Sequence, residues 1–180
     1  MKEVKIEKAL TFIEPGPVVL VTTFDGKSNN VMTISWTMAM DFAQHIAICT
    51  GEWNHSFGTM MRTKECVVCI PPAGMVETVV KIGMVSGADT DKFAKFGLEA
   101  LPAGTVQAPL IAGCLACLEC KVVDYVDKYG FVILHVTRVW ENPDSKDRKM
   151  LHAKGDGRFV ADGEVFDCRN LMEAKLPPGL

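Results

Sequence analysis

The chain has 180 residues, which suits a single domain with a sizeable hydrophobic core. Hydrophobic residues make up 48% and charged residues 23%, a balance that excludes an intrinsically disordered chain. The formal net charge of -3 gives no general attraction to nucleic acids or anionic membranes, so we expect neither as a partner. No apolar run approaches the ~20 residues of a membrane span, and the charged N-terminus is not typical of a signal peptide. We therefore expect a cytoplasmic protein.

The predicted elements are strand hairpins with helices inserted between them. Asp25-Gly26-Lys27 predicts a tight hairpin turn, because Asp-Gly supplies the positive φ angles that such turns require. The order of elements predicts one domain over 1–180, mainly β (α+β), with a barrel instead of alternating βαβ units. In chain order we expect a short helix or arm over 1–14, strands over 17–24, 30–38 and 45–50, a helix capped by Asn54 or Ser56, a strand over 65–71, a helix over 75–87 ended by Gly87, a helix over 89–98 capped by Asp89 or Thr90, strands over 114–127 and 130–141, and a last strand over 164–166.

The predicted strand over 30–38, NVMTISWTM, has an unusual polar face. A strand with one face in the core usually alternates apolar residues with charged or long polar ones. Here, at a period of two, one face carries Val31, Thr33, Ser35 and Thr37, and the other carries Asn30, Met32, Ile34, Trp36 and Met38. The short hydroxyls favour a polar ligand on this face; the alternative is an exposed strand of ordinary Thr and Ser residues.

The start of the helix after residue 51 is a candidate phosphate site. Free backbone N–H groups and the positive end of the helix dipole attract anions there. Asn54, His55, Ser56 and Thr59 cluster at this start. The alternative is an ordinary helix cap with a solvated basic end. Neither G-x-G-x-x-G nor G-x-x-x-x-G-K-[ST] occurs, so a nucleotide ligand would require a fold other than the Rossmann or P-loop type.

Seven cysteines are many for a cytoplasmic protein. Cys114-x-x-Cys117-x-x-Cys120 has the spacing of three iron–sulfur ligands, and Cys66-x-x-Cys69 resembles half a zinc site or a redox pair. Both runs lie in apolar strand-like segments, where a spacing of three places neighbouring cysteines on opposite faces. We therefore favour reduced cysteines in the core, which behave as small buried hydrophobes.

Several short motifs follow one another in a fixed order. They are Pro17-Val-Val-Leu-Val-Thr-Thr, Asp25-Gly-Lys, Asn30-x-x-Thr33-x-Ser35-Trp36, Ser56-x-x-Thr59, Thr63-Lys64-Glu65-x-Val67-Val68 and Ile70-Pro71. Together they resemble the flavin reductase-like, FMN-binding split-barrel family, and especially its flavoredoxin branch. The resemblance runs from about residue 12 to about residue 140. Each motif alone is unspecific, whereas their order and spacing together are fairly specific.

The resemblance implies a split β-barrel that forms a homodimer, with FMN near the subunit interface. The segment with Thr33, Ser35 and Trp36 would line the isoalloxazine ring and the ribityl chain, and the helix start at Ser56 would take the phosphate. The end of the stretch 30–38 would then be a ligand-binding turn that leaves the strand. The full set of cofactor-binding residues it implies is Asn30, Met32, Thr33, Ser35, Trp36, Thr50, Gly51, His55, Ser56, Thr59 and Lys92. It implies no metal ligand and no acid or base, because the cofactor does the redox chemistry itself.

Two departures from the family pattern bear on the electron donor. Many reductases of the family have Pro-Pro before the third strand and Gly-Asp-His at the start of a late strand, where the histidine is linked to the use of reduced nicotinamide. The corresponding places here read Ala43-Gln44-His45 and Asp127-Lys128-Tyr129-Gly130-Phe131. The sequence therefore favours a flavoredoxin-like protein that passes electrons between protein or small-molecule partners. An NAD(P)H:flavin oxidoreductase is the first alternative. A metal-binding, iron–sulfur or flavin-sensing module without enzymatic activity is the second.

Overall fold

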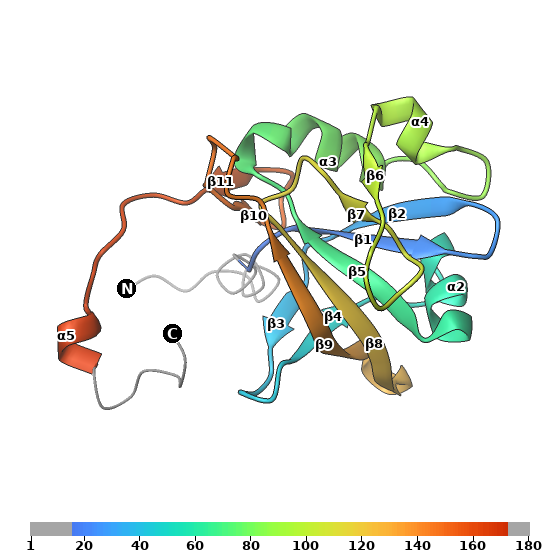
Figure 1. Cartoon of the computed structure of the whole chain (residues 1–180), viewed down its shortest axis with the longest axis horizontal. Coiled ribbons are helices and arrows are strands. Elements are labelled where there is room, and N and C mark those ends of the chain that lie inside the picture. The colour runs from blue at the N-terminus through green and yellow to red at the C-terminus, as the bar shows by residue number, and fades with distance from the viewer. Residues whose placement is uncertain (1–15, 173–180) are drawn as a thin grey trace.

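The computed structural model describes residues 16–172, so the helix or arm predicted over 1–14 lies outside the described residues. Antiparallel strands make up most of the fold and curl around a common core (Figure 1). The strands are β1 (Val19–Phe24), β2 (Asn29–Ile34), β3 (Thr37–Ala39), β4 (His45–Cys49), β5 (Glu65–Ile70), β6 (Ala100–Leu101), β7 (Leu110–Ile111), β8 (Ala116–Val126), β9 (Phe131–Glu141), β10 (Leu151–Ala153) and β11 (Phe159–Ala161). The helices are α2 (His55–Thr63), α3 (Val76–Gly83), α4 (Lys92–Phe96) and α5 (Arg169–Met172), with short 3-10 turns η2 (Ala73–Met75) and η3 (Asp127–Tyr129).

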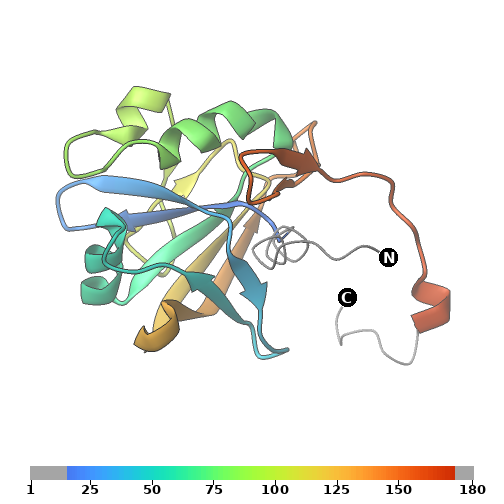
Figure 2. The ribbon, with the colours of Figure 1, turned by 180° about the vertical axis from the view of Figure 1, so that it is seen from behind.

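Seven strands form one sheet in the order β2-β1-β5-β8-β9-β4-β3. β2 and β3 are consecutive in the chain yet lie at opposite edges of this sheet, and only Ser35 and Trp36 connect them. Three extended residue steps span at most about 10 Å, so the two edges have to come together. The sheet therefore closes into a barrel with an open seam between β2 and β3 (Figures 1 and 2). The predicted fold class, a mainly β split barrel with inserted helices, is confirmed.

Two apolar clusters form the core, one on each side of the sheet. The interior of the barrel contains side chains from six of the seven strands, and α2 adds Phe57 and Met60 from one end. The other face of β1 and β5 packs against α3, which contributes Val79 and Ile82. Both faces of β1 are buried, which explains why its sequence is a continuous apolar run instead of an alternating one.

One strand over 30–38, which periodicity alone predicts, is wrong, because the chain leaves β2 at Ser35–Trp36 and changes to the opposite edge of the sheet. The end of the strand before residue 38 agrees with the turn that the resemblance implies there. The helix predicted to end at Gly87 ends at Gly83. The residues after it turn back toward β2, where Gly87 packs against Asn30. The next helix is capped by Asp91, whose carboxylate accepts the N–H of Ala94 at 3.0 Å, and not by Asp89 or Thr90.

The strand predicted over 164–166 is also wrong, since these residues adopt no regular structure. The last hairpin lies earlier and pairs β10 with β11. Asp162 fixes its position: one carboxylate oxygen accepts the N–H of Met150 at 2.9 Å, and the other lies 2.6 Å from Nε2 of His152. Each strand of this hairpin has only three residues, too few for an alternating pattern in the sequence to indicate it.

A buried carboxylate attaches the irregular segment 99–113 to the barrel. Glu119 on β8 accepts hydrogen bonds from the N–H groups of Gly104 and Thr105 at 2.7 and 2.6 Å, and from the indole N–H of Trp140 at 2.6 Å. The hydroxyl of Thr105 donates to the same carboxylate. Burial alone would raise the pKa of Glu119, but these hydrogen bonds outweigh it and lower the pKa to about 2. Glu119 is therefore ionised in the folded protein.

We predict that Glu119→Gln lowers the free energy of unfolding by about 1–3 kcal/mol, because the amide cannot accept all of these bonds. The control is Glu141→Gln on β9, since Glu141 is in a largely exposed pair with Arg148 and should contribute little. Because the folded pKa lies below the ordinary 4.5, the contribution of Glu119 is complete above that pH and is lost as the pH falls toward about 2. Chemical denaturation at several pH values checks this, and equal effects of the two substitutions would contradict it.

Candidate functional site

A cavity of about 240 Å³ lies where β2, the start of α2 and the segment between α3 and α4 meet. Histidine and lysine side chains line it, and no carboxylate does so among the described lining residues. The lining residues are Asn30, Met32, Thr33, Trp53, Asn54, His55, Ser56, Gly83, Met84, Val85, Ser86, Gly87 and Lys92. Polar donors without acidic side chains are what an anionic ligand requires.

The link between β2 and α2 at this cavity is a single side-chain pair. Asn30 donates its amide N–H to the hydroxyl oxygen of Ser56 at 2.9 Å, and Ser56 is almost fully buried. Because the Ser56 oxygen is the acceptor in this bond, its own hydroxyl hydrogen can point to a ligand. The amide oxygen of Asn30 is buried and has no hydrogen-bond partner. Unsatisfied buried oxygens are uncommon, so a donor from a ligand would complete the bonding of Asn30.

The first turn of α2 points its backbone toward the same place. Asn54 occupies the cap position, but its side chain makes no capping bond. It donates instead to the hydroxyl of Thr50 at 3.1 Å. The first N–H groups of a helix have no acceptor within the regular helix. Here the N–H of Phe57 donates to the carbonyl oxygen of Asn54 at 3.0 Å, so the N–H groups of His55 and Ser56 are the ones that an anion could accept. Together with the dipole of the nine-residue helix, they favour an anion at this end.

Lys92 brings a positive charge into the cavity from the start of α4. Its side chain is nearly buried, and its ammonium group donates to the carbonyl oxygen of Ile82 at 3.1 Å. Burial lowers the pKa of Lys92, an effect that nearby Asp89 partly opposes. A buried ammonium group with one neutral acceptor is costly for the fold, and an anion in the cavity would lower that cost.

Two hydroxyls on the polar face of residues 31–37 donate hydrogen bonds to other parts of the protein. Val31 is fully buried under α3. Thr33 donates its hydroxyl to the carbonyl oxygen of Val79 at 2.7 Å, and Thr37 donates to Pro17 at 3.1 Å. These hydroxyls hold β2 to α3 and β3 to the start of β1. Thr33 nevertheless lines the cavity, so the polar face is shared between packing and the site.

The structure brings six of the eleven predicted cofactor-binding residues to this cavity. The others lie next to it or elsewhere. Trp36 is half exposed in the connection between β2 and β3, and Thr59 lies one turn further along α2. Thr50 is fully buried and bonded to Asn54, while Gly51 packs under the ring of Trp53. The six at the cavity are Asn30, Met32, Thr33, His55, Ser56 and Lys92; the five outside its lining are Ser35, Trp36, Thr50, Gly51 and Thr59.

Sequence reasoning missed Trp53 and the segment 83–87, which form one wall of the cavity. The signal for this segment is its two glycines, which the helical spacing assigns to the interior and the end of a helix. A side chain at Gly87 would place its Cβ 2.2 Å from the amide oxygen of Asn30. The glycine is therefore needed for close approach of the chain to β2, and not for ending a helix.

Comparison with known proteins identifies the family. The model of the flavin reductase like domain matches residues 13–161, so the chain belongs to the flavin reductase-like family, whose fold is the split barrel. An uncharacterized protein of Archaeoglobus fulgidus is 35% identical over 143 residues, covering 74% of this chain and 81% of the relative.

Two solved structures are similar over most of their length. Flavoredoxin of Desulfovibrio vulgaris (Miyazaki F) has a TM-score of 0.84 at 22% identity, with 93% of this chain and 96% of that chain covered. An FMN-binding domain of a flavin reductases-like enzyme from Shewanella baltica has a TM-score of 0.78 at 25% identity, with 92% and 95% covered. The described residues contain no helix that is long and apolar enough to cross a membrane.

Because the ammonium group of Lys92 is buried at the cavity, we predict that the cavity binds an anion. Inorganic phosphate should raise the unfolding temperature of the protein without added flavin, because a bound anion stabilises the folded state. Lys92→Met should abolish this rise. Its own unfolding temperature should change little, since the lost bond to Ile82 is offset by removing a buried charge.

The control is Lys95→Met, which makes the same charge change at an exposed position of the same helix. Thermal unfolding with and without phosphate distinguishes the two. A phosphate effect that survives Lys92→Met, or that Lys95→Met removes equally, would contradict the assignment.

Proposed function

We propose that this protein binds FMN at the cavity and acts in electron transfer or flavin-dependent reduction as a flavoredoxin-like protein. The observation that carries the proposal is the convergence of the uncapped start of α2, the buried Ser56 and the buried Lys92 on one cavity without carboxylates. The flavin reductase-like fold, with a flavoredoxin and an FMN-binding domain among similar structures, supports it.

The residues present fit the two ends of FMN differently. The phosphate is a dianion, which the N–H groups of α2, the Ser56 hydroxyl and the Lys92 ammonium group can bind. The unpaired amide oxygen of Asn30 can accept a hydrogen bond from a hydroxyl of the ribityl chain. A cavity of about 240 Å³ is smaller than the usual site of a drug-sized ligand, so the flavin ring would lie at its mouth, where Trp53 is exposed.

When bound, FMN supplies the redox chemistry, and the protein supplies binding, orientation and electrostatics. In this proposal α2 and Lys92 hold the phosphate, Asn30 orients the chain, and Trp53 covers part of the ring. We assign no acid or base to the site. The absence of the family histidine near Gly130 favours exchange of electrons with a partner protein or a small molecule over direct use of NAD(P)H.

We further propose a homodimer that completes the site. The connection after β2, the edge strand β3 and the turn that follows it expose large apolar side chains, namely Trp36, Met38, Met40 and Phe42. A second group, Val165, Phe166 and Leu171, is exposed on α5 and the segment before it, which extend away from the barrel (Figures 1 and 2). Exposed apolar surfaces of this kind on an edge strand and an extended arm are typical of subunit contacts.

The first test is the visible absorbance of the purified protein. Flavin bands that disappear when acid releases FMN, identified by its mass, would support the proposal. A broad brown absorbance with bound iron and no flavin would contradict it and favour the cysteine-based alternative. Stopped-flow mixing with NADH and NADPH then separates the two flavin functions. Slow bleaching of the flavin is expected for an electron carrier, whereas fast bleaching by either nucleotide would establish a reductase.

The phosphate position makes a separate prediction. Ser56→Glu should weaken FMN retention, because it places a negative charge against the phosphate and takes away the acceptor of Asn30. Gly58→Glu adds the same charge to the same helix at an exposed position with open space around the Cβ, and should retain FMN. Fluorescence titration after removal of FMN measures both. Equal retention in the two variants would exclude this phosphate site.

A further inference from the structure

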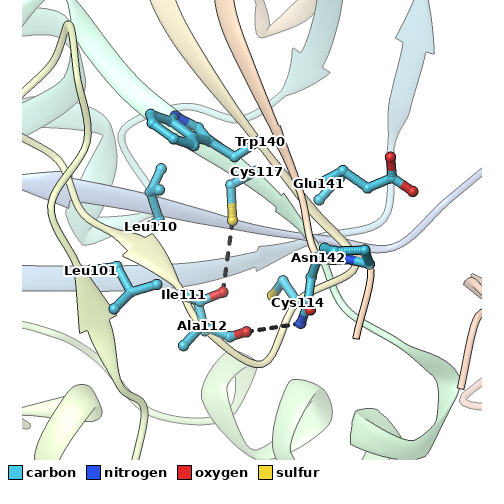
Figure 3. A pocket seen from close by; sticks show the side chains of 11 residues that line it. Leu101, Leu110, Ile111, Ala112, Cys114, Cys117, Trp140, Glu141 and Asn142 are labelled. Carbon is cyan, nitrogen blue, oxygen red and sulfur yellow. Dashed lines mark hydrogen bonds between the residues drawn. The ribbon is translucent and has the colours of Figure 1, made fainter. Parts of the chain in front are cut away.

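A second cavity of about 240 Å³ lies on the other side of the sheet from the barrel interior, between β7, β8 and the end of β9. Its wall is mostly apolar and includes Leu101, Leu110 and Trp140 (Figure 3). Leu101 and Trp140 are each more than a third exposed, so the cavity opens to solvent. The carboxylate of Glu141 at the rim is paired with Arg148 and points away from the interior.

Two cysteines reach the wall of this cavity. The thiol of Cys117 points inward and lies 3.7 Å from the carbonyl oxygen of Ile111 (Figure 3). Cys114 lines the cavity beside it. The prediction that a spacing of three separates cysteines onto opposite faces holds for Cys117 and Cys120 but is wrong for Cys114. Cys114 precedes the first residue of β8, so it does not follow the alternation of the strand.

A third cysteine lies directly across the sheet from Cys117. Cys69 on β5 is its partner in the register. Opposite residues in an antiparallel ladder alternate between pairs that exchange backbone hydrogen bonds and pairs that do not. Lys64 and Val122 are a hydrogen-bonded pair, because the N–H of Val122 donates to the carbonyl oxygen of Lys64. The Cys69–Cys117 pair, five positions further along β5, is therefore a pair without such bonds. Opposite Cα atoms at such positions are about 4.5 Å apart, which lies within the range that a disulfide spans.

The three thiols also interact with one another. The neighbouring thiols of Cys114 and Cys69 lower the pKa of Cys117. Burial raises the pKa of Cys69. The sulfur of Cys117 points into the cavity, so Cys117 is the thiol placed to meet a ligand there. All three are free thiols in the structure. Among residues 16–172 no group of three or more such side chains is arranged to hold a metal ion.

We propose that Cys117 and Cys69 form a thiol-exchange site that takes small neutral disulfides from this cavity. The Cys117 thiolate attacks one sulfur of the ligand, the ligand S–S bond breaks, and the first ligand thiolate leaves. Cys69 then attacks the Cys117 sulfur and displaces the second ligand thiolate. One ligand disulfide is thereby reduced to two thiols, which take the protons of the two cysteines, and one Cys69–Cys117 disulfide forms.

The apolar wall defines the class of ligand. A charged molecule would lose hydration in this cavity without gaining a partner, whereas a neutral aromatic or aliphatic disulfide loses little. The chain also contains a control pair, which differs in register as well as in access because it falls at a hydrogen-bonded position of the same ladder. Cys66 and Cys120 are likewise opposite each other on β5 and β8 and fully buried, but they lie in the barrel interior and line neither cavity. The site is independent of the proposed flavin function.

The test uses the full chain with Cys49→Ser and Cys168→Ser, which removes the two cysteines outside the core. Addition of 4,4′-dithiodipyridine to the folded protein should release two thiopyridones per chain. Digestion without reductant should then yield a peptide pair joined through Cys69 and Cys117. Cys117→Ser should abolish the release, and Cys66→Ser should leave it unchanged. The anionic 5,5′-dithiobis(2-nitrobenzoate) should react more slowly than the neutral reagent.

Three results would overturn the proposal. They are reaction only after unfolding, a mixed disulfide that persists on Cys117 without closure to Cys69, and equally fast oxidation of Cys66 and Cys120. If Cys117→Ser does not fold, Cys117→Ala replaces it. The digest of the chain with only Cys49→Ser and Cys168→Ser tests the Cys69–Cys117 disulfide without any further substitution.

Discussion

The fold depends on one short connection. β2 and β3 are joined by Ser35 and Trp36 but lie at opposite edges of a seven-stranded sheet, so the sheet can exist only as a closed barrel. Two hydrogen bonds fix the connection: the N–H of Cys49 donates to Trp36, and the hydroxyl of Thr37 donates to Pro17. Closure of the barrel fixes the position of β2, and in this position Asn30 lies next to the start of α2. The candidate site is therefore a consequence of barrel closure.

The local structure could be predicted from the sequence wherever one short segment determines it. The apolar runs predicted β1, β5, β8 and β9, and Asp-Gly at 25–26 predicted the first hairpin, because burial and turn chemistry act over a few residues. The break at Ser35 was not predictable in this way. It depends on pairing of β3 with β4 and on closure, and both involve distant parts of the chain. The hairpin of β10 with β11 is local, but each of its strands has only three residues, too few for an alternating pattern to indicate a strand.

In the candidate site, too, the sequence predicts the residues whose role is local and not those whose role depends on the fold. Ser56 and His55 were found from the helix start, whose chemistry is local. The segment 83–87 was missed because its role depends on packing against Asn30, more than fifty positions earlier in the chain. The residues at the cavity also show features that reduce stability, namely a buried lysine and an unpaired amide oxygen. Local conflicts of this kind are expected at functional sites, where a ligand completes the interactions. The two cavities share no lining residue and use different chemistry, one for an anion and one for thiols.

The central claim is that the start of α2 binds the phosphate of a flavin. The most direct measurement compares the affinity of the flavin-free protein for FMN and for riboflavin, which differ only in that phosphate, by calorimetric titration. Two charge-assisted hydrogen bonds at about 1.5 kcal/mol each would give FMN an advantage of roughly 100-fold. That preference, lost when inorganic phosphate competes, is the expected result. Equal affinity for the two flavins would show that the phosphate is not bound at this helix start.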